Sequence, residues 1–374
     1  MKRLFIAHLL PVEYYPLMIN FIEELEYEPD AQVMVFSTHN NMGREVVNSS
    51  TVSIKRTENY AFTKQPILKI WRLFLLVLKS FWQAIKTKPD VIMYFEPHSA
   101  ITAYLYMRLV NPKVRLYIHN YEYYSKNDFL EPNMVSVRWF HYLETSYLYK
   151  KATWISQTNA ARLKFFHEDY PFVEKDNLKI VPNYPPKKWL KFKNPIKTQI
   201  EKLRLLYIGS LSFENTYIRE IVDFVNHNKN DVSLTIYGFN VKDDVKTYLE
   251  NQVDDIVKFH DNGIPYNDIP KIAGQFNVGL ILYKAHNINF KYNAPNKLFE
   301  YLACNLSVWL PNVMQGCRPY LDATSRPVIT AIDFEALDLN SIENFKKSLT
   351  LPFAQKVYTS QEALKPLKQH LLAS

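Results

Sequence analysis

Glycine is scarce in this sequence, which has 7 glycines among 374 residues. Only one of them, Gly43, precedes Gly209. A G-x-G-x-x-G dinucleotide fingerprint and a P-loop both need several glycines, because the backbone must approach phosphate closely. Neither pattern occurs. The sequence therefore argues against a classical NAD-binding protein and against a Walker-type ATPase.

Cysteine is also rare. The two cysteines, Cys304 and Cys317, form neither a C-x-x-C pair nor a set of zinc ligands, and they favour a reducing compartment. The apolar run at the N-terminus is interrupted by Pro11 and Glu13, which favours a buried first strand over a secretion signal. With no cleavable signal and no transmembrane span in the sequence, we expect a cytoplasmic protein.

Acidic residues are outnumbered by basic ones, and the net charge is +8. Such a charge suits nucleic acid, anionic lipid or phosphorylated substrates. No nucleic-acid-binding motif accompanies it, so we expect no nucleic-acid partner. The segment Lys64–Lys88 intersperses Lys and Arg with Trp and Phe. It is either a long core helix with lysines at its rim or a helix that lies in a membrane interface. The two readings are compatible, and the second predicts an association with the inner leaflet of a membrane.

Apolar runs of strand length alternate with helix-length stretches through most of the chain. Continuous runs of this kind are typical of parallel strands covered on both faces. The first series of predicted strands comprises Leu4–Leu10, Gln32–Ser37, Val91–Phe95, Val114–His119, Trp154–Ser156 and Leu178–Val181. The second series comprises Leu203–Ile208, Ser233–Tyr237, Val257–Phe259, Val278–Leu282 and Ser307–Leu310. We therefore expect an α/β protein with two doubly wound domains.

A segment rich in proline and lysine, which begins at Pro182, separates the two series. We place the first domain at residues 1–185, the linker at 186–202 and the second domain at 203–352. A helical tail at 353–374 is expected to cross back to the first domain. The two domains are expected to face each other across a cleft, where ligands bind at the carboxyl ends of the strands.

The segment Asn293–Val308 reads NAPNKLFEYLACNLSV, a polar loop followed by an amphipathic helix and a strand. Pro295 suits the first turn of a helix, and Asn293 or Asn296 can cap free backbone amides. A helix that starts at the strand ends offers its amides and its positive dipole end to a diphosphate. Glu300 falls about one turn into the helix, where its carboxylate can accept hydrogen bonds from vicinal ribose hydroxyls.

This segment resembles the donor-binding motif of glycosyltransferases with the GT-B fold. The resemblance is strongest to the family 4 bacterial enzymes that build polysaccharides, capsules and lipid-linked glycans. Their pattern S-P-x-K-x-x-E-Y-x-A-x-G-x-P-V is matched by Pro295, Lys297, Glu300, Tyr301, Ala303 and Val308. The resemblance implies two Rossmann-like domains and assigns the ribose to Glu300. The chain departs from the pattern at Tyr292, where the family's E-x7-E pair has a glutamate, and at Asn305 and Ser307.

Other strand ends of the second domain fit the same layout. Leu205–Ser210 resembles the family's first donor-domain strand with its glycine, Ser233–Gly238 the second strand, and His260–Pro265 the loop that meets the base. The donor-binding residues implied by the resemblance are Gly209, Ser210, Tyr237, Gly263, Ile264, Asn293, Pro295, Asn296, Lys297, Leu298 and Glu300.

The basic pair that neutralises the diphosphate in the family is missing here. The equivalent places lie near Ser210 and Thr216–Tyr217. Two phosphate charges in a cleft need compensation. Arg219, Lys284 or Lys291 can substitute, and we prefer Lys297, with Lys291 as second choice.

In the first domain, Tyr117–Ser125 resembles the family's strand-end H-x-x-E stretch. His119 and Glu122 are therefore the predicted catalytic residues. His119 would face the donor sugar, and Glu122 would orient the acceptor or the following loop. Glu96–Ser99 ends the preceding strand and is a second candidate. The loop Pro11–Pro16 lacks the family's glycine pair, so its contact with a ligand must differ or be absent.

The resemblance implies a glycosyltransferase that moves a sugar from a UDP-sugar or a GDP-sugar to a glycan or lipid-linked acceptor. It also implies retention of anomeric configuration, no metal, no cofactor and a place in bacterial surface glycan assembly. The missing glutamate and basic pair leave a second reading, a catalytically degenerate GT-B protein that acts as a binding or scaffold subunit. A nucleotide-sugar epimerase or a phosphorylase on this fold is a third reading, although neither a cofactor lysine nor an extra phosphate site stands out.

Overall fold

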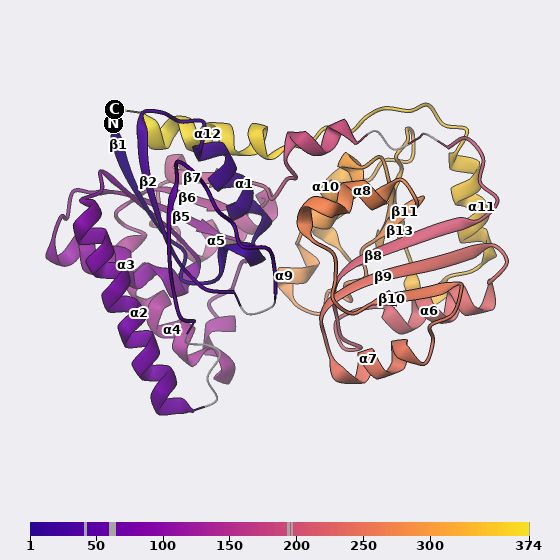
Figure 1. The fold of residues 1–374 in the computed structure, drawn as a ribbon, viewed down its shortest axis with the longest axis horizontal. Helices are drawn as coiled ribbons and strands as arrows, with labels where there is room; N and C mark the ends of the chain where they lie inside the picture. Colours follow the sequence, from indigo (N-terminus) through magenta and orange to yellow (C-terminus); the bar gives the residue numbers. More distant parts are fainter. Residues whose placement is uncertain (41–42, 60–64, 193–194, 196, 374) are drawn as a thin grey trace. The chain divides into compact units, whose positions relative to one another are not determined.

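The computed structural model describes residues 1–40, 43–59, 65–192, 195 and 197–373. The chain divides into two compact units (Figure 1). The N-terminal unit comprises Met1–Asn183 and the segment from Ser360 onward, and the C-terminal unit comprises Tyr184–Thr359. Residues 193, 194 and 196 of the predicted linker lie outside the described residues, as do Lys64 of the predicted basic helix and Ser374 of the predicted tail.

A seven-stranded parallel sheet forms the centre of the N-terminal unit, in the order β3-β2-β1-β4-β5-β6-β7. Its strands are β1 (Lys2–Ala7), β2 (Ala31–Thr38), β3 (Ser53–Thr57), β4 (Val91–Phe95), β5 (Arg115–Asn120), β6 (Ala152–Gln157) and β7 (Leu178–Ile180). The strand β4 reads VIMYF and is buried along its whole length. Such a strand carries apolar side chains on both faces because both faces are covered.

Helices cover the two faces of this sheet. One face packs against α1 (Pro16–Leu25) and α12 (Ser360–Leu372). The other packs against α2 (Pro66–Thr87), α3 (Glu96–Leu109), α4 (Val135–Leu143) and α5 (Ala160–Asp169). The C-terminal helix α12 is fixed to α1 by buried leucines and by Lys368, whose ammonium lies 3.0 Å from Glu24 and 2.9 Å from Glu28.

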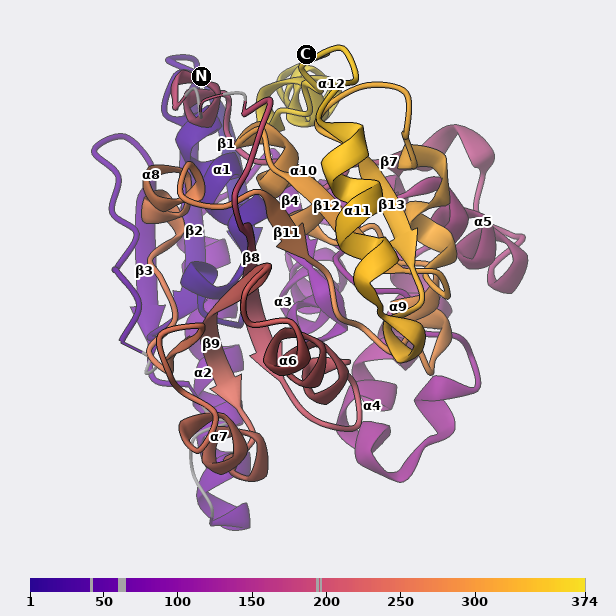
Figure 2. The ribbon, with the colours of Figure 1, turned by 90° about the vertical axis from the view of Figure 1, so that its right-hand side faces the viewer.

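The C-terminal unit is built on a six-stranded parallel sheet in the order β10-β9-β8-β11-β12-β13. Its strands are β8 (Leu203–Leu211), β9 (Val232–Val241), β10 (Val257–His260), β11 (Val278–Leu280), β12 (Ser307–Pro311) and β13 (Ile329–Ile332). The helices α6 (Ile218–His227), α7 (Asp243–Glu250) and α11 (Leu339–Ser348) pack in one hydrophobic core (Figure 2). The helices α8 (Ile269–Ala273) and α10 (Asn296–Ala303) pack in another, and α9 (Ile288–Lys291) precedes α10.

Part of the predicted linker belongs to the C-terminal unit. Residues Lys187–Lys191 form a 3-10 turn in which Trp189 is 1% exposed, with its ring 4.8 Å from that of Tyr266. The chain leaves the N-terminal unit after Asn183, two residues before the predicted boundary. Among the described residues, no helix combines the length and the apolar character that crossing a membrane would require.

Candidate functional site

The helix α10 is fixed beside the point where the strand order of the C-terminal unit reverses, between β8 and β11. Gly279 in β11 leaves room for the ring of Tyr301, with which any Cβ at position 279 would collide. Tyr301 is fully buried, and its hydroxyl accepts a hydrogen bond of 3.1 Å from the backbone amide of Ile208. The glycine therefore sets how closely α10 approaches the two central strands.

The loop before α10 is held by a 3-10 turn at Gln315–Tyr320. Gly316 lies so close to the carbonyl oxygens of Tyr292 and Asn293 that a Cβ there would overlap both. The Cys317 thiol donates to the Asn293 carbonyl at 3.4 Å. The helix then begins after Pro295 without a side-chain cap. The backbone amide of Leu298 donates to the Pro295 carbonyl at 3.0 Å, which leaves the amides of Asn296 and Lys297, in a fixed position, to an anion.

Glu300 lies one turn into α10 and has no exposed surface. Its Oε1 accepts a hydrogen bond of 2.6 Å from Asn296 Nδ2, and its Oε2 lies 2.6 Å from Lys297 Nζ. The Lys297 side chain is itself only 15% exposed. The structure thus brings three predicted donor residues into one cluster, in which Asn296 and Lys297 occupy both oxygens of the carboxylate.

The four basic residues considered for a diphosphate differ in their surroundings. Lys297 is paired with Glu300, and Lys284 lies 3.1 Å from Glu220. The Arg219 guanidinium lies over the rings of Phe213 and Tyr248, at 4.4 and 5.2 Å from their centroids. Lys291, at the end of α9, is exposed and makes no ion pair with the described residues. Of the four, Lys291 is the one whose ammonium can turn to a new anion without breaking an existing contact.

The space beside Gly209 is filled by the protein itself. A Cβ at this position would stand 2.8 Å from the hydroxyl of Tyr207, which donates to the carbonyl of Ser210 at 2.7 Å. Position 209 is therefore a glycine because the Tyr207 hydroxyl occupies the space that a side chain would need. Ser210 is half-buried in the last part of β8.

The predicted donor-binding residues Tyr237, Gly263 and Ile264 lie in the middle of β9 and in the turn after β10. Tyr237 is in register with His260, and their rings stack with centroids 4.5 Å apart and planes at 13°. Gly263 has a φ of +66° in the turn after β10, a conformation that favours glycine. Ile264 packs against the core beneath α10, and Leu298 is completely buried in that core. Leu298 therefore contributes packing, with no surface left for a ligand.

In the N-terminal unit, aromatic side chains pack around the loop after β1. This is the loop that lacks the family's glycine pair. The ring of Tyr15 stacks on Tyr121 at 4.6 Å and meets His8 edge to face at 4.8 Å. The backbone amide of Leu9 donates to Ser99 Oγ at 2.9 Å, which ties this loop to α3. The side chains of His8, Tyr15 and Tyr121 thus occupy the point between β1 and β4 where the strand order reverses.

His119 lies in this aromatic cluster and is completely buried. Its ring centroid is 5.1 Å from that of Tyr121 and 5.5 Å from that of Phe95, and its Nδ1 lies 2.9 Å from Ser156 Oγ. Burial lowers the pKa of His119 to about 3 and that of His8 to about 4, so both imidazoles are neutral at pH 7. In this arrangement His119 has no surface that faces a donor sugar, contrary to the placement expected from the sequence.

Glu96 is the first residue of α3 and has a φ of +63°, in the left-handed region that non-glycine residues rarely adopt. Its carboxylate is buried, and Oε1 accepts hydrogen bonds from the backbone amides of Tyr121 at 2.5 Å and Glu122 at 3.3 Å. Burial, with repulsion from Glu122, raises the pKa of Glu96 to about 8. Glu122 is exposed, and its Oε2 accepts a hydrogen bond from the Tyr124 hydroxyl. Glu96 therefore fixes the loop that carries Glu122.

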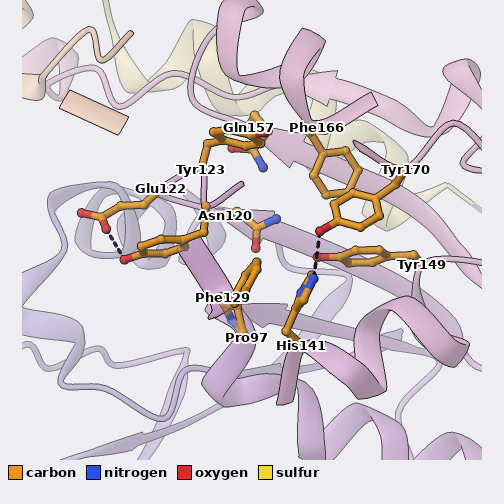
Figure 3. A pocket seen from close by; sticks show the side chains of 11 residues that line it. Pro97, Asn120, Glu122, Tyr123, Phe129, His141, Tyr149, Gln157, Phe166 and Tyr170 are labelled. Carbon is orange, nitrogen blue, oxygen red and sulfur yellow. Dashed lines mark hydrogen bonds between the residues drawn. The ribbon is translucent and has the colours of Figure 1, made fainter. Parts of the chain in front are cut away.

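A pocket opens at the carboxyl ends of β5 and β6, entirely within the N-terminal unit (Figure 3). Its cavity volume is about 20 Å³, room for about one water molecule. Aromatic rings form its walls, and the side chains of Asn120 and Gln157, which end the two strands, point into it. Glu122 also lines it. Within the described parts of the chain, no three His, Cys, Asp or Glu side chains gather closely enough to hold a metal ion.

No protein-family model and no curated protein matches this sequence. Solved structures match over the whole chain. Alr3699/HepE of Anabaena, in complex with UDP, gives a TM-score of 0.67 at 13% identity and covers 100% of both chains. The lipopolysaccharide outer core galactosyltransferase WaaB gives 0.57 at 12% identity, covering 99% of this chain and 95% of that one. Sucrose-phosphate synthase of Thermosynechococcus elongatus gives 0.64 at 11% identity, covering 99% and 98%.

The chain has the GT-B fold. The predicted architecture of two Rossmann-like domains is thereby confirmed, with sheets of seven and six parallel strands. Within this GT-B fold, sequence reasoning did not single out Asn120, Gln157 or Gly316. For Asn120 and Gln157 the available signal was that each is a polar residue at the end of a buried strand, and that the two strands are neighbours. No local signal marks Gly316, because its contact partners lie more than twenty positions earlier in the chain.

Proposed function

We propose that this protein is a glycosyltransferase that moves a sugar from a nucleoside diphosphate to an acceptor hydroxyl. The observation that carries this proposal is the start of α10, where uncapped backbone amides and the buried carboxylate of Glu300 lie within one turn of each other. Amides at a helix start suit a diphosphate, and a carboxylate suits the ribose hydroxyls. The UDP bound to Alr3699/HepE supports a UDP-sugar as donor, with a GDP-sugar as the alternative.

In the proposed reaction, the bond between the anomeric carbon and the diphosphate oxygen breaks, and the acceptor oxygen forms a bond to the same carbon. The acceptor proton passes to the departing diphosphate oxygen. The amides at the start of α10 and a lysine stabilise the charge that develops there. Following the family resemblance, we propose that configuration is retained and that no metal takes part. A role in bacterial surface glycan assembly is supported by the fold likeness to WaaB, a lipopolysaccharide outer core galactosyltransferase.

We expect Lys291→Met to weaken UDP binding about tenfold, because a mobile ammonium next to a diphosphate contributes a charge-assisted contact of modest strength. Isothermal titration calorimetry with UDP, and in parallel with GDP, measures this effect. The matched control is Lys347→Met, which removes an exposed lysine from α11 in the other core of the same unit. Equal affinities in the two variants would remove Lys291 from the site. If millimolar UDP and GDP both fail to bind the wild-type protein, the scaffold reading is favoured.

We also propose that α2 rests on an anionic membrane surface. One face of this helix packs into the core of the N-terminal unit through residues such as Leu76 and Ala84. A second face exposes a continuous apolar stripe at helical spacing, comprising Ile67, Ile70, Trp71, Phe74, Leu78 and Trp82. The helix contains no acidic residue, and Lys69, Lys79 and Lys86 are exposed around the stripe. Bulky apolar residues flanked by lysines suit the interface of an anionic bilayer.

The wild-type protein is expected to float with vesicles of phosphatidylglycerol and phosphatidylcholine, and to bind pure phosphatidylcholine vesicles much less. The triple variant Trp71→Ser, Phe74→Ser, Trp82→Ser should bind the anionic vesicles at least about tenfold less, since it loses most of the apolar contact. The control variant Tyr27→Ser, Val253→Ser, Leu339→Ser removes three exposed apolar residues elsewhere. Equal flotation of both triple variants would contradict the assignment of α2.

A further inference from the structure

The chain passes between the two units twice, once after Asn183 and once after Thr359. A half-buried tyrosine of the C-terminal unit stands next to each of these two passages, Tyr184 at the first and Tyr358 at the second. The two tyrosine rings contact each other, with centroids 5.2 Å apart. The two passages are therefore joined inside the C-terminal unit, although they are far apart in the sequence.

Both tyrosines pack on Phe299, a residue of α10 that is 1% exposed. The centroid of the Phe299 ring lies 4.5 Å from that of Tyr184 and 5.1 Å from that of Tyr358. A third tyrosine, Tyr320, lies 5.0 Å from Phe299 and 5.8 Å from Tyr358. The planes of these pairs are inclined by 56° to 82°, the tilted and edge-to-face geometry that aromatic pairs prefer. These four residues, the ring cluster, fix both passages to α10.

The loop before α10 is joined to the same ring cluster by the 3-10 turn Gln315–Tyr320. At one end of this turn, Gly316 lies against the carbonyl oxygens of Tyr292 and Asn293. At its other end, Tyr320 belongs to the ring cluster. The backbone that offers amides to an anion is thus connected to both passages by two routes, through α10 itself and through this turn.

Each passage is short, because the N-terminal unit also holds it close to the boundary. The backbone amide of Val181 donates to the Gln157 carbonyl at 2.9 Å, and Gln361 Nε2 donates to Glu24 Oε1 at 2.6 Å. Loosening the ring cluster would therefore lengthen both passages at once. Two residues of each passage lie between the anchors of the two units: Pro182 and Asn183 in the first, and Thr359 and Ser360 in the second.

We propose that the ring cluster couples the donor site to both passages, so that a nucleoside diphosphate bound at the start of α10 rigidifies the two connections between the units. This inference rests on the proposed function and gives the donor an effect beyond its own site. A ligand at the start of α10 stabilises the turn that contains Phe299 and Glu300. Local opening of α10 and of the passages packed on it then requires more free energy. By linkage, the passages change the affinity for the nucleotide by the same factor.

Hydrogen exchange of the full-length protein with and without UDP, followed by mass spectrometry, tests this coupling. UDP should slow exchange at least about fivefold in α10 and in peptides that cover residues 178–190 and 352–366. Exchange in α7 should not change, because α7 packs in the other core of the C-terminal unit. Tyr358→Leu keeps an apolar side chain and removes the ring that contacts Tyr184 and Phe299. In this variant UDP should still protect α10, and both passages should lose most of the protection that UDP confers.

Three further variants serve as controls and as an arm without ligand. Tyr358→Phe retains the ring and should behave as the wild type. Tyr248→Leu removes a half-buried tyrosine from α7 and should leave the protection of both passages unchanged. Glu300→Gln loosens the first turn of α10 without any ligand, because it disrupts the contacts with Asn296 and Lys297. It should speed exchange in both passages, and it should have no such effect in the Tyr358→Leu background.

The outcomes separate the coupling from the donor site. If UDP protects α10 and neither passage, or if Tyr358→Leu keeps the protection of both passages, the coupling is overturned and the proposed function stands. If UDP and GDP both fail to bind, the proposed donor site falls, and the arm without ligand decides the coupling. Faster exchange of both passages in Glu300→Gln then supports the coupling, and unchanged exchange overturns it.

Discussion

Replacing Glu300 with glutamine is expected to weaken UDP binding by roughly 100-fold, or about 2.7 kcal/mol. The carboxylate can accept charge-assisted hydrogen bonds from both ribose hydroxyls, whereas an amide offers one neutral acceptor. The same change disturbs the protein, because the amide nitrogen of the glutamine would face Lys297 Nζ, which now lies 2.6 Å from Glu300 Oε2. Calorimetric titration with UDP measures the first effect, and thermal unfolding measures the second.

A double-mutant cycle separates the ligand contact from the structural one. Lys297→Met removes the cation that Glu300→Gln leaves unpaired, so the double variant should regain most of the lost unfolding temperature. Its UDP affinity should stay low if Glu300 binds the ribose. If the affinity instead recovers with the stability, Glu300 only holds α10 together. Lys297→Met alone completes the cycle, and it should lower stability because it leaves a fully buried carboxylate without its cation.

This cycle matters because Glu300 is covered in the structure. A ribose can reach the carboxylate only if Asn296 or Lys297 gives up its hydrogen bond. Such an exchange replaces one charge-assisted bond by another, so it need not oppose binding strongly. In the proposed complex, a Lys297 that gave up this bond would be able to contact the phosphates. Lys291 and Lys297 would then act at different stages, the first on encounter and the second after the ribose is seated.

The two sheets could be predicted because their inner strands are continuous apolar runs. Strands such as β4, which is buried on both faces, can be predicted from their apolar run alone. Two strands were not predicted, β3 and β13, and both lie at a sheet edge. The segment of β3 reads SIKRT and none of it is fully buried. An edge strand of this kind lacks the apolar run because one side of it faces water, so its pairing is decided by its neighbour.

The helix start at Asn293–Glu300 could likewise be predicted, because proline placement and dipole direction are local properties. The predicted cap by Asn293 or Asn296 was wrong, since α10 begins after Pro295 without a side-chain cap. The neighbours of individual side chains could not be predicted in this way. Gly209 was assigned to a ligand, and the group beside it is the hydroxyl of Tyr207. His119 was placed at a strand end, where the sequence does not reveal that Tyr121 and Phe95 pack around the ring. Both outcomes depend on packing between residues whose contacts no periodicity encodes.

Glu96 carries the second large expected effect, a dependence of stability on pH in the N-terminal unit. Its pKa is about 8 in the folded protein, against an ordinary value of 4.5, because burial penalises the charged form. Between these two values the folded protein holds a proton that the unfolded chain has released. The free energy of unfolding therefore falls as the pH rises from about 4.5 to about 8, by on the order of 5 kcal/mol in total.

Glu96→Gln should abolish this loss. A glutamine mimics the protonated acid, since its oxygen can accept from the backbone amides of Tyr121 and Glu122 as Glu96 Oε1 does. The variant and the wild type should have similar stability near pH 5, and the variant should be the more stable at pH 9. Calorimetric scans from pH 5 to pH 9, with hydrogen exchange of peptides that cover β4 and β5, measure the difference and place it in this unit.

The two buried histidines act in the opposite direction and serve as an internal reference. The pKa values of His8 and His119 are lowered to about 4 and about 3, so the stability due to their neutral forms is lost as the pH falls below 6.5. Glu96→Gln leaves that acid limb unchanged, and Glu131→Gln, at an exposed position, should leave the whole curve unchanged. Glu122→Gln should reduce the alkaline loss in part, because the Glu122 charge raises the pKa of Glu96. Parallel curves for Glu96→Gln and wild type up to pH 9 would mean that Glu96 is ionised in the folded protein, with its two backbone hydrogen bonds outweighing its burial.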